Sequence, residues 1–340
     1  MGKRTITVFG ATGNQGGSVA RIFLQDPRLS GWQVRAVTRD CHRPAAQKLK
    51  ALGAELVCAD MDDIASLTNA MRESYAVFAV TNYWEKADMN YEIQQGKNLA
   101  DAAVSAKVQL FIWSSLYNVN KPRRLTSAGV VTNGDLSRVY HCDSKSIVED
   151  HIRQQPLRST FFYAGFYMSN ISGSSTSDTS SNTATFGSPG GMFKADNQGR
   201  WTFSLPMSSK AIVPVFHTGD TGKFIKAAVL REEEVVGRRI LGATAYMTCN
   251  EIVEGFKNVF PKAGQLAQYR AQSEADFREE LGKAGTPSYV VDEVYENMAL
   301  LDREGLYGGD SLEWTHSLLE DSLMPWEEFA RASTGFAGLG

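Results

Sequence analysis

The first half of the chain alternates between two spacings of hydrophobic residues. Short apolar or β-branched runs predict strands at residues 5–9, 33–38, 55–59, 76–81, 109–113 and 159–163. Between these runs, apolar residues at helical spacing predict helices at residues 14–24, 45–52, 63–71, 91–106 and 144–154. Strands that are regularly separated by helices favour an α/β fold built on a doubly wound parallel sheet.

The pattern changes after residue 165. Residues 169–182 contain seven Ser and two Thr, which predicts a surface loop, either a plain insertion or a lid over a cleft. Strands are predicted at residues 201–204 and 211–214, helices at 218–230 and 249–260, and a charged helical region beyond residue 268. We therefore predict a sheet domain over residues 1–165. Residues 166–340 are predicted to form a smaller α+β lobe that faces a substrate or a partner and whose elements can interleave with the first domain.

A glycine-rich turn, GATGNQG at residues 10–16, joins the first strand to the first helix. Glycine suits each special place in such a turn: a tight bend, close approach of the backbone to a pyrophosphate, and close contact between helix and strand. Amides at the helix N-terminus then face the phosphates. Because the motif lies within a strand–turn–helix unit, it predicts a Rossmann-type dinucleotide site.

The end of the second strand distinguishes NADP from NAD. NAD-binding proteins usually carry an acidic residue there, which accepts hydrogen bonds from the ribose and repels a 2′-phosphate. This chain has Thr38 and Arg39, followed by Arg43 and Lys48, and a guanidinium suits the recognition of a phosphate. Asp40 follows directly and offers an acidic alternative. The sequence favours NADP(H) over NAD(H), with Arg39 on the 2′-phosphate.

The third predicted strand ends in four polar or flexible residues, Asp60, Met61, Asp62 and Asp63. We expect the first three to border the adenine. Asp62 or Asp63 also suits the N-cap of the next helix, and capping explains either side chain at least as well as contact with a ligand.

Composition narrows the function classes. The net charge is −3 over 340 residues, and no run of Lys and Arg supplies the many phosphate contacts of a nucleic-acid-binding surface. No stretch approaches the roughly 18 apolar residues of a membrane span, and no secretory signal is evident. Four scattered cysteines, Cys41, Cys58, Cys142 and Cys249, lack metal-ligand spacing. We expect reduced thiols, no metal, no membrane, no direct nucleic-acid partner, and a cytoplasmic or nuclear location.

With these residues in place, the chain resembles the NmrA-like proteins, an atypical branch of the short-chain dehydrogenase/reductase superfamily. Besides GATGNQG, the resemblance rests on AVTRD (36–40), VFAVTNYWE (77–85), QGKNLADAA (95–103), HCDSK (141–145) and DTGK (220–223). It covers residues 4–330 and is nearest to the subgroup of NADP(H)-sensing regulators found in fungi and animals. It implies a Rossmann domain and a smaller C-terminal lobe, with the dinucleotide in the cleft between them.

The resemblance also implies contacts for each part of the cofactor. The pyrophosphate is expected at Gly10, Thr12, Gly13, Asn14, Gln15 and Gly16, and the 2′-phosphate at Arg39. Thr81, Asn82 and Tyr83 are expected beside the ribose and nicotinamide, Lys145 on the nicotinamide ribose, and Tyr163, Gly165 and Phe166 on the far side of that pocket. These places agree with the rule that ligands bind beyond the carboxyl ends of the strands.

The catalytic pair of ordinary short-chain dehydrogenases is altered. Those enzymes use Tyr-x-x-x-Lys, in which the lysine lowers the tyrosine pKa for proton exchange. Here His141 stands four residues before Lys145, and Tyr140 is one place off, about 100° around a helix. Ser114 and Ser115 lie where the catalytic serine belongs, although serines at strand ends are commonly turn residues.

Three interpretations of the pair are open. His141 and Lys145 together catalyse, since histidine exchanges protons near neutral pH; Lys145 acts alone, as the related isoflavone-reductase-like enzymes imply; or Lys145 only anchors the ribose. The resemblance favours the third, and with it a redox-sensing or dinucleotide-sensing regulatory protein, for example in transcriptional regulation, that meets a protein partner through its C-terminal lobe. The alternative is an NADPH-dependent oxidoreductase that reduces a small carbonyl, imine or enone.

Overall fold

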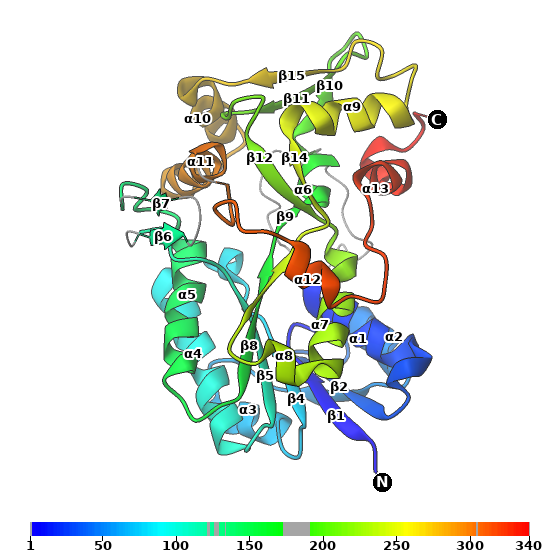
Figure 1. Cartoon of the computed structure of the whole chain (residues 1–340), viewed down its shortest axis with the longest axis vertical. Helices are drawn as coiled ribbons and strands as arrows, with labels where there is room; N and C mark the ends of the chain where they lie inside the picture. Colours follow the sequence, from blue (N-terminus) through cyan, green and yellow to red (C-terminus); the bar gives the residue numbers. More distant parts are fainter. Residues whose placement is uncertain are drawn as a thin grey trace.

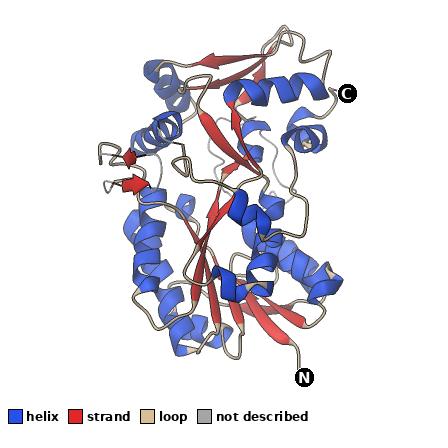
Figure 2. Cartoon of the chain, in the orientation of Figure 1, coloured by secondary structure: helices blue, strands red, loops and turns tan. Residues whose placement is uncertain are grey.

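Two lobes lie one above the other along the long axis of the computed structural model (Figures 1 and 2). The structure describes residues 2–120, 123–125, 129–132, 134–172, 191–303 and 305–339. The lower lobe contains a seven-stranded sheet, and the upper lobe contains two three-stranded sheets. The chain enters at the bottom of the lower lobe and ends in the upper lobe.

All strands of the lower sheet run parallel, in the order β13-β8-β5-β4-β1-β2-β3. They are β1 (Arg4–Val8), β2 (Trp32–Thr38), β3 (Glu55–Cys58), β4 (Ala76–Ala79), β5 (Leu110–Ser115), β8 (Ser159–Ala164) and β13 (Arg239–Gly242). The chain winds outward from β1 to one side through β2 and β3, and to the other side through β4, β5 and β8. This reversal between β1 and β4 is the point where a doubly wound sheet opens a crevice at its carboxyl edge. The predicted Rossmann-type fold is confirmed.

Helices cover both faces of the lower sheet (Figure 1). One face carries α3 (Ile64–Ala70), α4 (Met89–Ser105) and α5 (Tyr140–Arg153), and the other carries α1 (Asn14–Gln25), α2 (Pro44–Ala51) and α7 (Thr221–Leu230). Successive strand residues point to opposite faces. On β8, Phe162 therefore packs with α1 and α7, while Phe161 packs with α3, α4 and α5.

The upper lobe is built around a second hydrophobic core. Its sheets are β10 (Phe193–Ala195), β11 (Trp201–Leu205) and β15 (Gln268–Ala271), and β14 (Ala245–Thr248), β12 (Ile212–Phe216) and β9 (Phe166–Tyr167). Its helices are α6 (Met168–Ser172), α9 (Cys249–Val259), α10 (Glu274–Lys283), α11 (Ser288–Arg303) and α13 (Trp326–Ala332). Phe193, Phe256 and Trp326 are buried together where these elements meet. The upper lobe is therefore an α+β layer with its own core.

Shorter elements complete the described chain. They are the β6 (Arg123–Leu125) and β7 (Gly129–Thr132) hairpin, α8 (Glu232–Val235), α12 (Glu313–Ser317), and the 3₁₀ turns η1 (Pro27–Leu29), η2 (Tyr83–Glu85), η3 (Thr218–Asp220) and η4 (Thr334–Phe336). Asp63 caps α3 through the amides of Ala65 and Ser66, as expected for one of the two candidate caps. In the described ranges, no helix is long and apolar enough to cross a bilayer, and no group of acidic, His or Cys residues is arranged for a metal ion.

Several sequence expectations need correction. The region beyond residue 268 is not purely helical, because residues 268–271 form β15 beside β11. Strand β13 was not predicted, since its run is only four residues long and starts with an arginine. Cys41 and Cys58 are joined in a disulfide, with their Cα atoms 5.9 Å apart, whereas all four thiols were expected to be reduced. In the Ser-rich segment, residues 169–172 belong to α6, and residues 173–182 lie outside the described residues.

Candidate cofactor-binding and catalytic site

A cavity of about 690 Å³ lies at the carboxyl edge of the lower sheet, between the two lobes. Its floor comes from the carboxyl ends of β1, β2, β3, β4, β5 and β8 and the residues that follow them. The upper lobe contributes Phe166 and Tyr167 of β9, Ser169 and Asn170 of α6, Asn297 and Leu301 of α11, and Leu306. Its place matches the crevice that the topology predicts.

The glycine turn lines one end of this cavity and is packed too closely for side chains. Gly10 has φ +61°, a conformation that favours glycine. A Cβ on Gly16 would lie 2.3 Å from the Gly10 carbonyl oxygen, so α1 starts directly against the turn. Gly13 is the N-cap of α1 and supplies no capping side chain. The first amides of a 12-residue helix therefore face the cavity, an arrangement that fits a phosphate group.

Gln15 ties this turn to the rest of the site. Its amide nitrogen donates to the hydroxyl of Tyr167 at 2.8 Å, and its amide oxygen accepts from Ser114 at 2.8 Å. Ser114 is thus engaged in holding the turn. Ser115 donates instead to the buried carboxylate of Glu149 at 2.7 Å. Ser115 also donates to the backbone carbonyl of Lys145 at 3.4 Å.

The loop after β2 forms the rim near the glycine turn. Arg39 lines the cavity, and its guanidinium donates to Glu85 of η2 at 2.5 Å. Asp40 and Arg43 also line this rim and lie 3.7 Å apart. More than half of the Arg39 side chain is exposed. A cation is therefore present where a 2′-phosphate was expected, with a carboxylate already beside it.

The residues after β3 divide between two roles. Asp60 and Met61 line the cavity, as expected for the adenine border. Asp62 does not: its carboxylate accepts from Tyr91 at 2.8 Å and from Gln95 at 3.1 Å, both on α4. Its contact with the adenine stays a prediction.

Lys145 lies at the other end of the cavity in a buried polar cluster. Its ammonium donates to Glu92 at 2.8 Å, to the Thr81 hydroxyl at 3.0 Å and to the Thr81 carbonyl at 3.3 Å. Glu92 is 2% exposed at its side chain and also accepts from Thr81 and Ser144. Three acceptors match the three donors of an ammonium group. Lys145 is thus held as one half of a buried ion pair that borders the cavity.

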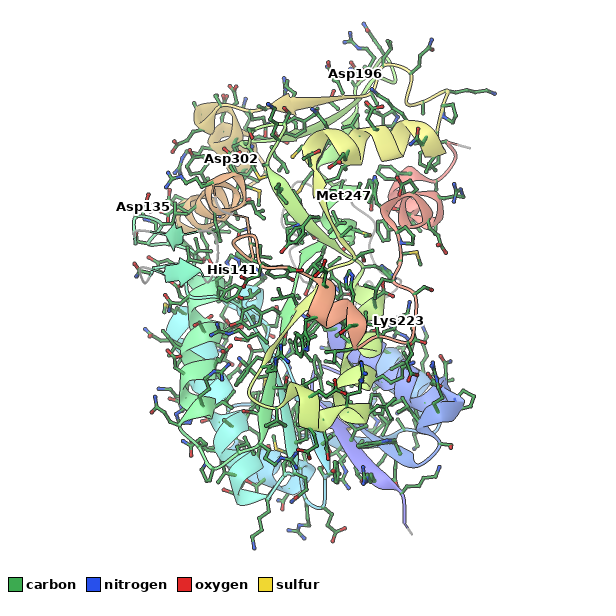
Figure 3. The ribbon with its side chains drawn as sticks, viewed as in Figure 1. Asp135, His141, Asp196, Lys223, Met247 and Asp302 are labelled. Carbon is green, nitrogen blue, oxygen red and sulfur yellow. A yellow bond between two sulfur atoms is a disulfide. The ribbon has the colours of Figure 1, made fainter. Side chains whose placement is uncertain are left out.

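His141 lies one helical turn before Lys145, where the two lobes meet (Figure 3). Its Nδ1 is 2.7 Å from a carboxylate oxygen of Glu293, which belongs to α11 of the upper lobe. The other oxygen of Glu293 accepts from the Tyr83 hydroxyl at 2.6 Å. The Trp84 ring lies 5.2 Å from the imidazole, centroid to centroid. Tyr140, the first residue of α5, is not among the cavity-lining residues of the described chain.

Interactions around the imidazole set its charge. Burial lowers the pKa of His141, but its contacts with Cys142 and Glu293 outweigh burial and raise that pKa to about 10. Tyr83 has a raised pKa because it is buried and donates to Glu293. The carboxylate of Glu293 beside the ring thus favours the protonated, cationic form of the imidazole.

Of the residues predicted around the end of β8, as of those after β3, some line the cavity and others do not. Gly165 and Phe166 line the cavity, and so do Asn82 and Tyr83 from the end of β4. Tyr163 is not among the lining residues: its side chain is fully buried and donates to Glu149 at 2.7 Å. It lies on the same face of β8 as Phe161, two residues earlier, and α5 covers that face.

Several site residues were missed from the sequence. They come mainly from the upper lobe, and one comes from η2; they are Glu85, Ser169, Asn170, Glu293, Asn297, Leu301 and Leu306. Glu293 and Asn297 are four residues apart and both buried, so a polar pair on the otherwise apolar buried face of α11 was the available signal.

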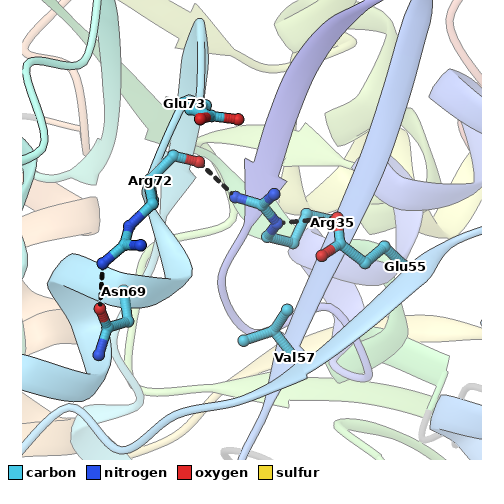
Figure 4. A pocket seen from close by; sticks show the side chains of 6 residues that line it. All are labelled: Arg35, Glu55, Val57, Asn69, Arg72 and Glu73. Atoms are coloured by element: carbon cyan, nitrogen blue, oxygen red, sulfur yellow. Dashed lines mark hydrogen bonds and ion pairs between the residues drawn. The ribbon is translucent and has the colours of Figure 1, made fainter.

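A second hollow, of about 340 Å³, lies away from the cavity and shares no lining residue with it (Figure 4). Arg35 of β2 crosses it and donates to Glu55 at 2.9 Å and to the backbone carbonyls of Ala70 and Arg72. These bonds hold the end of α3 against the sheet, so the residues around this hollow form a structural packing cluster.

The parallel sheet, the glycine turn and the cavity at the carboxyl edge define a protein of the Rossmann-type class. The family model described as the NmrA-like family matches residues 2–330, and the chain therefore belongs to the NmrA-like family. The resemblance seen in the sequence is confirmed.

The chain is similar to other proteins both in sequence and in fold. An "NmrA-like family domain-containing oxidoreductase hkm9" of Aspergillus hancockii is 33% identical over 276 residues, which cover 78% of this chain and 75% of that protein. The solved structure of NmrA, a negative transcriptional regulator, in complex with NADP has a TM-score of 0.72 at 20% identity and covers 97% of this chain and 95% of that one. A Citrobacter sp. triphenylmethane reductase has a TM-score of 0.71 at 18% identity, covering 96% and 98%. The two structures share the fold.

Proposed function

We propose that the chain binds NADP(H) and uses it as a reductase of a small carbonyl, imine or enone compound. One observation carries this proposal: the cavity that starts at the glycine turn ends at Lys145 and His141, under the upper lobe. A pocket that holds both a phosphate-binding turn and ionisable side chains is typical of an active site. The relatives that match about three quarters of the chain are named oxidoreductases, which supports the same function.

The chain's own residues suggest how the dinucleotide is held. The α1 amides after Gly13 receive the pyrophosphate. Arg39 receives the 2′-phosphate in place of Glu85, which gives the preference for NADP(H) over NAD(H). The nicotinamide riboside then lies between the end of β4 and Gly165–Phe166, beside Lys145. When bound in its reduced form, the nicotinamide supplies a hydride.

The contacts of Lys145 favour an anchoring role over proton donation. All three of its donors meet acceptors within the protein, and its charge is opposed by Glu92. Its ammonium therefore keeps the end of β4 in place next to the ribose. His141 is the other cationic side chain at this end of the cavity, so the absence of a tyrosine at that position does not remove the proton donor.

A dinucleotide-sensing regulator is the second candidate. It is favoured by the fact that the cavity touches both lobes, since a cofactor that binds two arrangements of the lobes unequally would shift one toward the other. The upper lobe would then present a different surface to a protein partner. NmrA, described as a negative transcriptional regulator, shares this fold.

Calorimetric titration with NADPH and NADH, followed by NADPH oxidation with a panel of carbonyl, imine and enone compounds, tests both candidates. A reductase binds NADPH and turns over at least one compound class. NADPH binding without turnover of any class contradicts the reductase and leaves the regulator. No affinity for either dinucleotide contradicts both.

A further inference from the structure

Glu293 is a buried carboxylate of the upper lobe that reaches into the lower lobe. It is fully buried and accepts three hydrogen bonds. The donors are the backbone amide of His141 at 2.8 Å, the imidazole Nδ1 of His141 at 2.7 Å and the Tyr83 hydroxyl at 2.6 Å. Two of the three donors belong to one residue, and that residue lines the cavity. The carboxylate thus fixes both the backbone and the ring of His141.

A buried carboxylate requires a cation nearby, because isolated buried charge is costly. The titratable groups around the imidazole are Tyr83 of η2, Cys142, Asp143 and Lys145 of α5, Glu92 of α4 and Glu293 of α11. Lys145 is already paired with Glu92. The imidazole of His141 is therefore the cation that balances Glu293, in agreement with its raised pKa of about 10, which its contacts with Cys142 and Glu293 produce against the effect of burial.

We propose that Glu293 is the positioning residue that makes His141 the proton donor of the reduction, and that the substrate is a neutral ketone, quinone or enone. This inference rests on the proposed reductase function. Glu293 lies against Nδ1 of the imidazole, and the His141 ring lines the cavity. The proton exchange with a molecule in the cavity is therefore assigned to Nε2. Tyr83 holds the second oxygen of the carboxylate and so keeps its orientation.

The step balances in atoms and electrons. A hydride from the reduced nicotinamide forms a C–H bond at the carbonyl carbon, or at the β-carbon of an enone, and the C=O electrons move onto oxygen. The Nε2–H bond of His141 breaks as an O–H bond forms, and its electron pair stays on the imidazole. NADPH is oxidised to NADP⁺, the substrate is reduced, and His141 regains a proton from water.

The charges in the cavity indicate the substrate class. The upper-lobe residues that line it, Phe166, Tyr167, Ser169, Asn170, Asn297, Leu301 and Leu306, carry no formal charge among the described residues. A cationic imidazole disfavours a protonated imine and stabilises the negative charge that develops on a carbonyl oxygen. An uncharged carbonyl compound fits both features.

The first test needs no substrate. Ring NMR signals of the chain's five histidines are followed against pH, with His141 assigned by its loss in His141→Gln. The wild-type imidazole should stay protonated beyond pH 8, and in Glu293→Gln its pKa should fall by at least about one unit, because the neutral amide no longer stabilises the cation. The matched control is Glu296→Gln on the same helix, whose carboxylate faces Arg138.

The second test measures turnover. The probes are 2-cyclohexen-1-one and 9,10-phenanthrenequinone as carbonyl compounds and 2-methyl-1-pyrroline as an imine. Glu293→Gln should lower kcat by on the order of 100-fold at neutral pH with little change in KM for NADPH, since general acid catalysis is lost. The alkaline limb of the pH–rate profile should shift downward together with the NMR-derived pKa. Glu296→Gln should match the wild type in both respects.

The outcomes separate the inference from the function on which it rests. A wild-type His141 that titrates at its ordinary pKa, or equal titration in wild type and Glu293→Gln, overturns the inference whether or not the chain is an enzyme. If His141 titrates as expected in the wild type and in Glu293→Gln but no probe is turned over, the reductase function is overturned instead. Turnover of the imine alone overturns the substrate class. If Glu293→Gln fails to fold, the wild-type titration still decides the charge of His141.

Discussion

The two ends of the cavity are built in different ways. The phosphate end consists of backbone from one short segment, residues 10–16, where glycines exclude side chains. The proposed nicotinamide end consists of buried polar and charged side chains from η2, α4, α5 and α11, which lie between residues 83 and 293 of the chain. The first end depends on glycines, which leave no side chains in the turn. The second end depends on buried charges that neutralise each other. They should therefore fail for different reasons when residues are changed.

Removing the charge of Lys145 should produce the largest effect. Lys145→Met leaves Glu92, which is almost fully buried, without its cation. The free energy of unfolding should fall by about 3–5 kcal/mol, as measured by urea denaturation.

The matched double variant Lys145→Met/Glu92→Gln removes both charges and should recover a large part of that loss, because no buried charge is left unpaired. A single variant as stable as the wild type would show that the nicotinamide end does not depend on charge balance.

Filling the glycine turn should produce the next largest effect, now on binding. In Gly16→Ala, the new Cβ meets the Gly10 carbonyl oxygen at 2.3 Å, so α1 must move away from the turn. The affinity for NADPH should fall on the order of 100-fold in calorimetric titration, since overpacking of this kind costs about 1–3 kcal/mol. Gly31→Ala is the control, because no atom lies within 4 Å of its added Cβ. Equal affinities in the two variants would contradict a backbone-built phosphate site.

Arg39 tests whether the rim adds a side-chain contact to the backbone site. Arg39→Ala should weaken NADPH binding by about 10- to 100-fold, the worth of a charge-assisted hydrogen bond, and should leave NADH binding nearly unchanged. Arg200→Ala, an exposed arginine paired with Asp196 in the upper lobe, is the control. Equal losses for the two dinucleotides would mean that Arg39 does not recognise the 2′-phosphate.

Glu85 should produce the smallest effect, with the opposite sign. Glu85→Gln removes the carboxylate that engages Arg39, a partly exposed ion pair of the kind worth about 0.2–1 kcal/mol. NADPH binding should tighten by about two- to fivefold, because the phosphate no longer competes with Glu85. Weaker binding would instead make Glu85 a contributor to cofactor binding.

The same contrast explains what could be predicted from the sequence. The glycine turn is contiguous, so its spacing and its place between strand and helix were enough to predict it. Arg39 and Asp60 follow predicted strands and Thr81 ends one, and parallel strands bring their carboxyl ends to one edge. The side chains of Tyr163 and Asp62 point to Glu149 and Tyr91 instead of lining the cavity, because a strand-end position does not determine which way a side chain turns.

Contacts between residues far apart in the sequence could not be predicted from sequence patterns. Glu293 lies 152 residues after His141, and only the packing of α11 against the lower lobe brings them within 2.7 Å. The Cys41–Cys58 disulfide was missed for a related reason, because scattered cysteines carry no spacing signal and the ends of β2 and β3 meet only in the sheet.

Strand β13 has a consequence for how the molecule can be made. It completes the lower sheet beside β8, yet it is translated about 75 residues later. Until residues 239–242 leave the ribosome, β8 presents an unpaired edge that includes Phe161 and Phe162. Such an edge is a template for intermolecular pairing. A polypeptide released after residue 165 should therefore self-associate during synthesis, whereas in one that extends past residue 242 the outer edge is β13, a strand of only four residues that begins with Arg239.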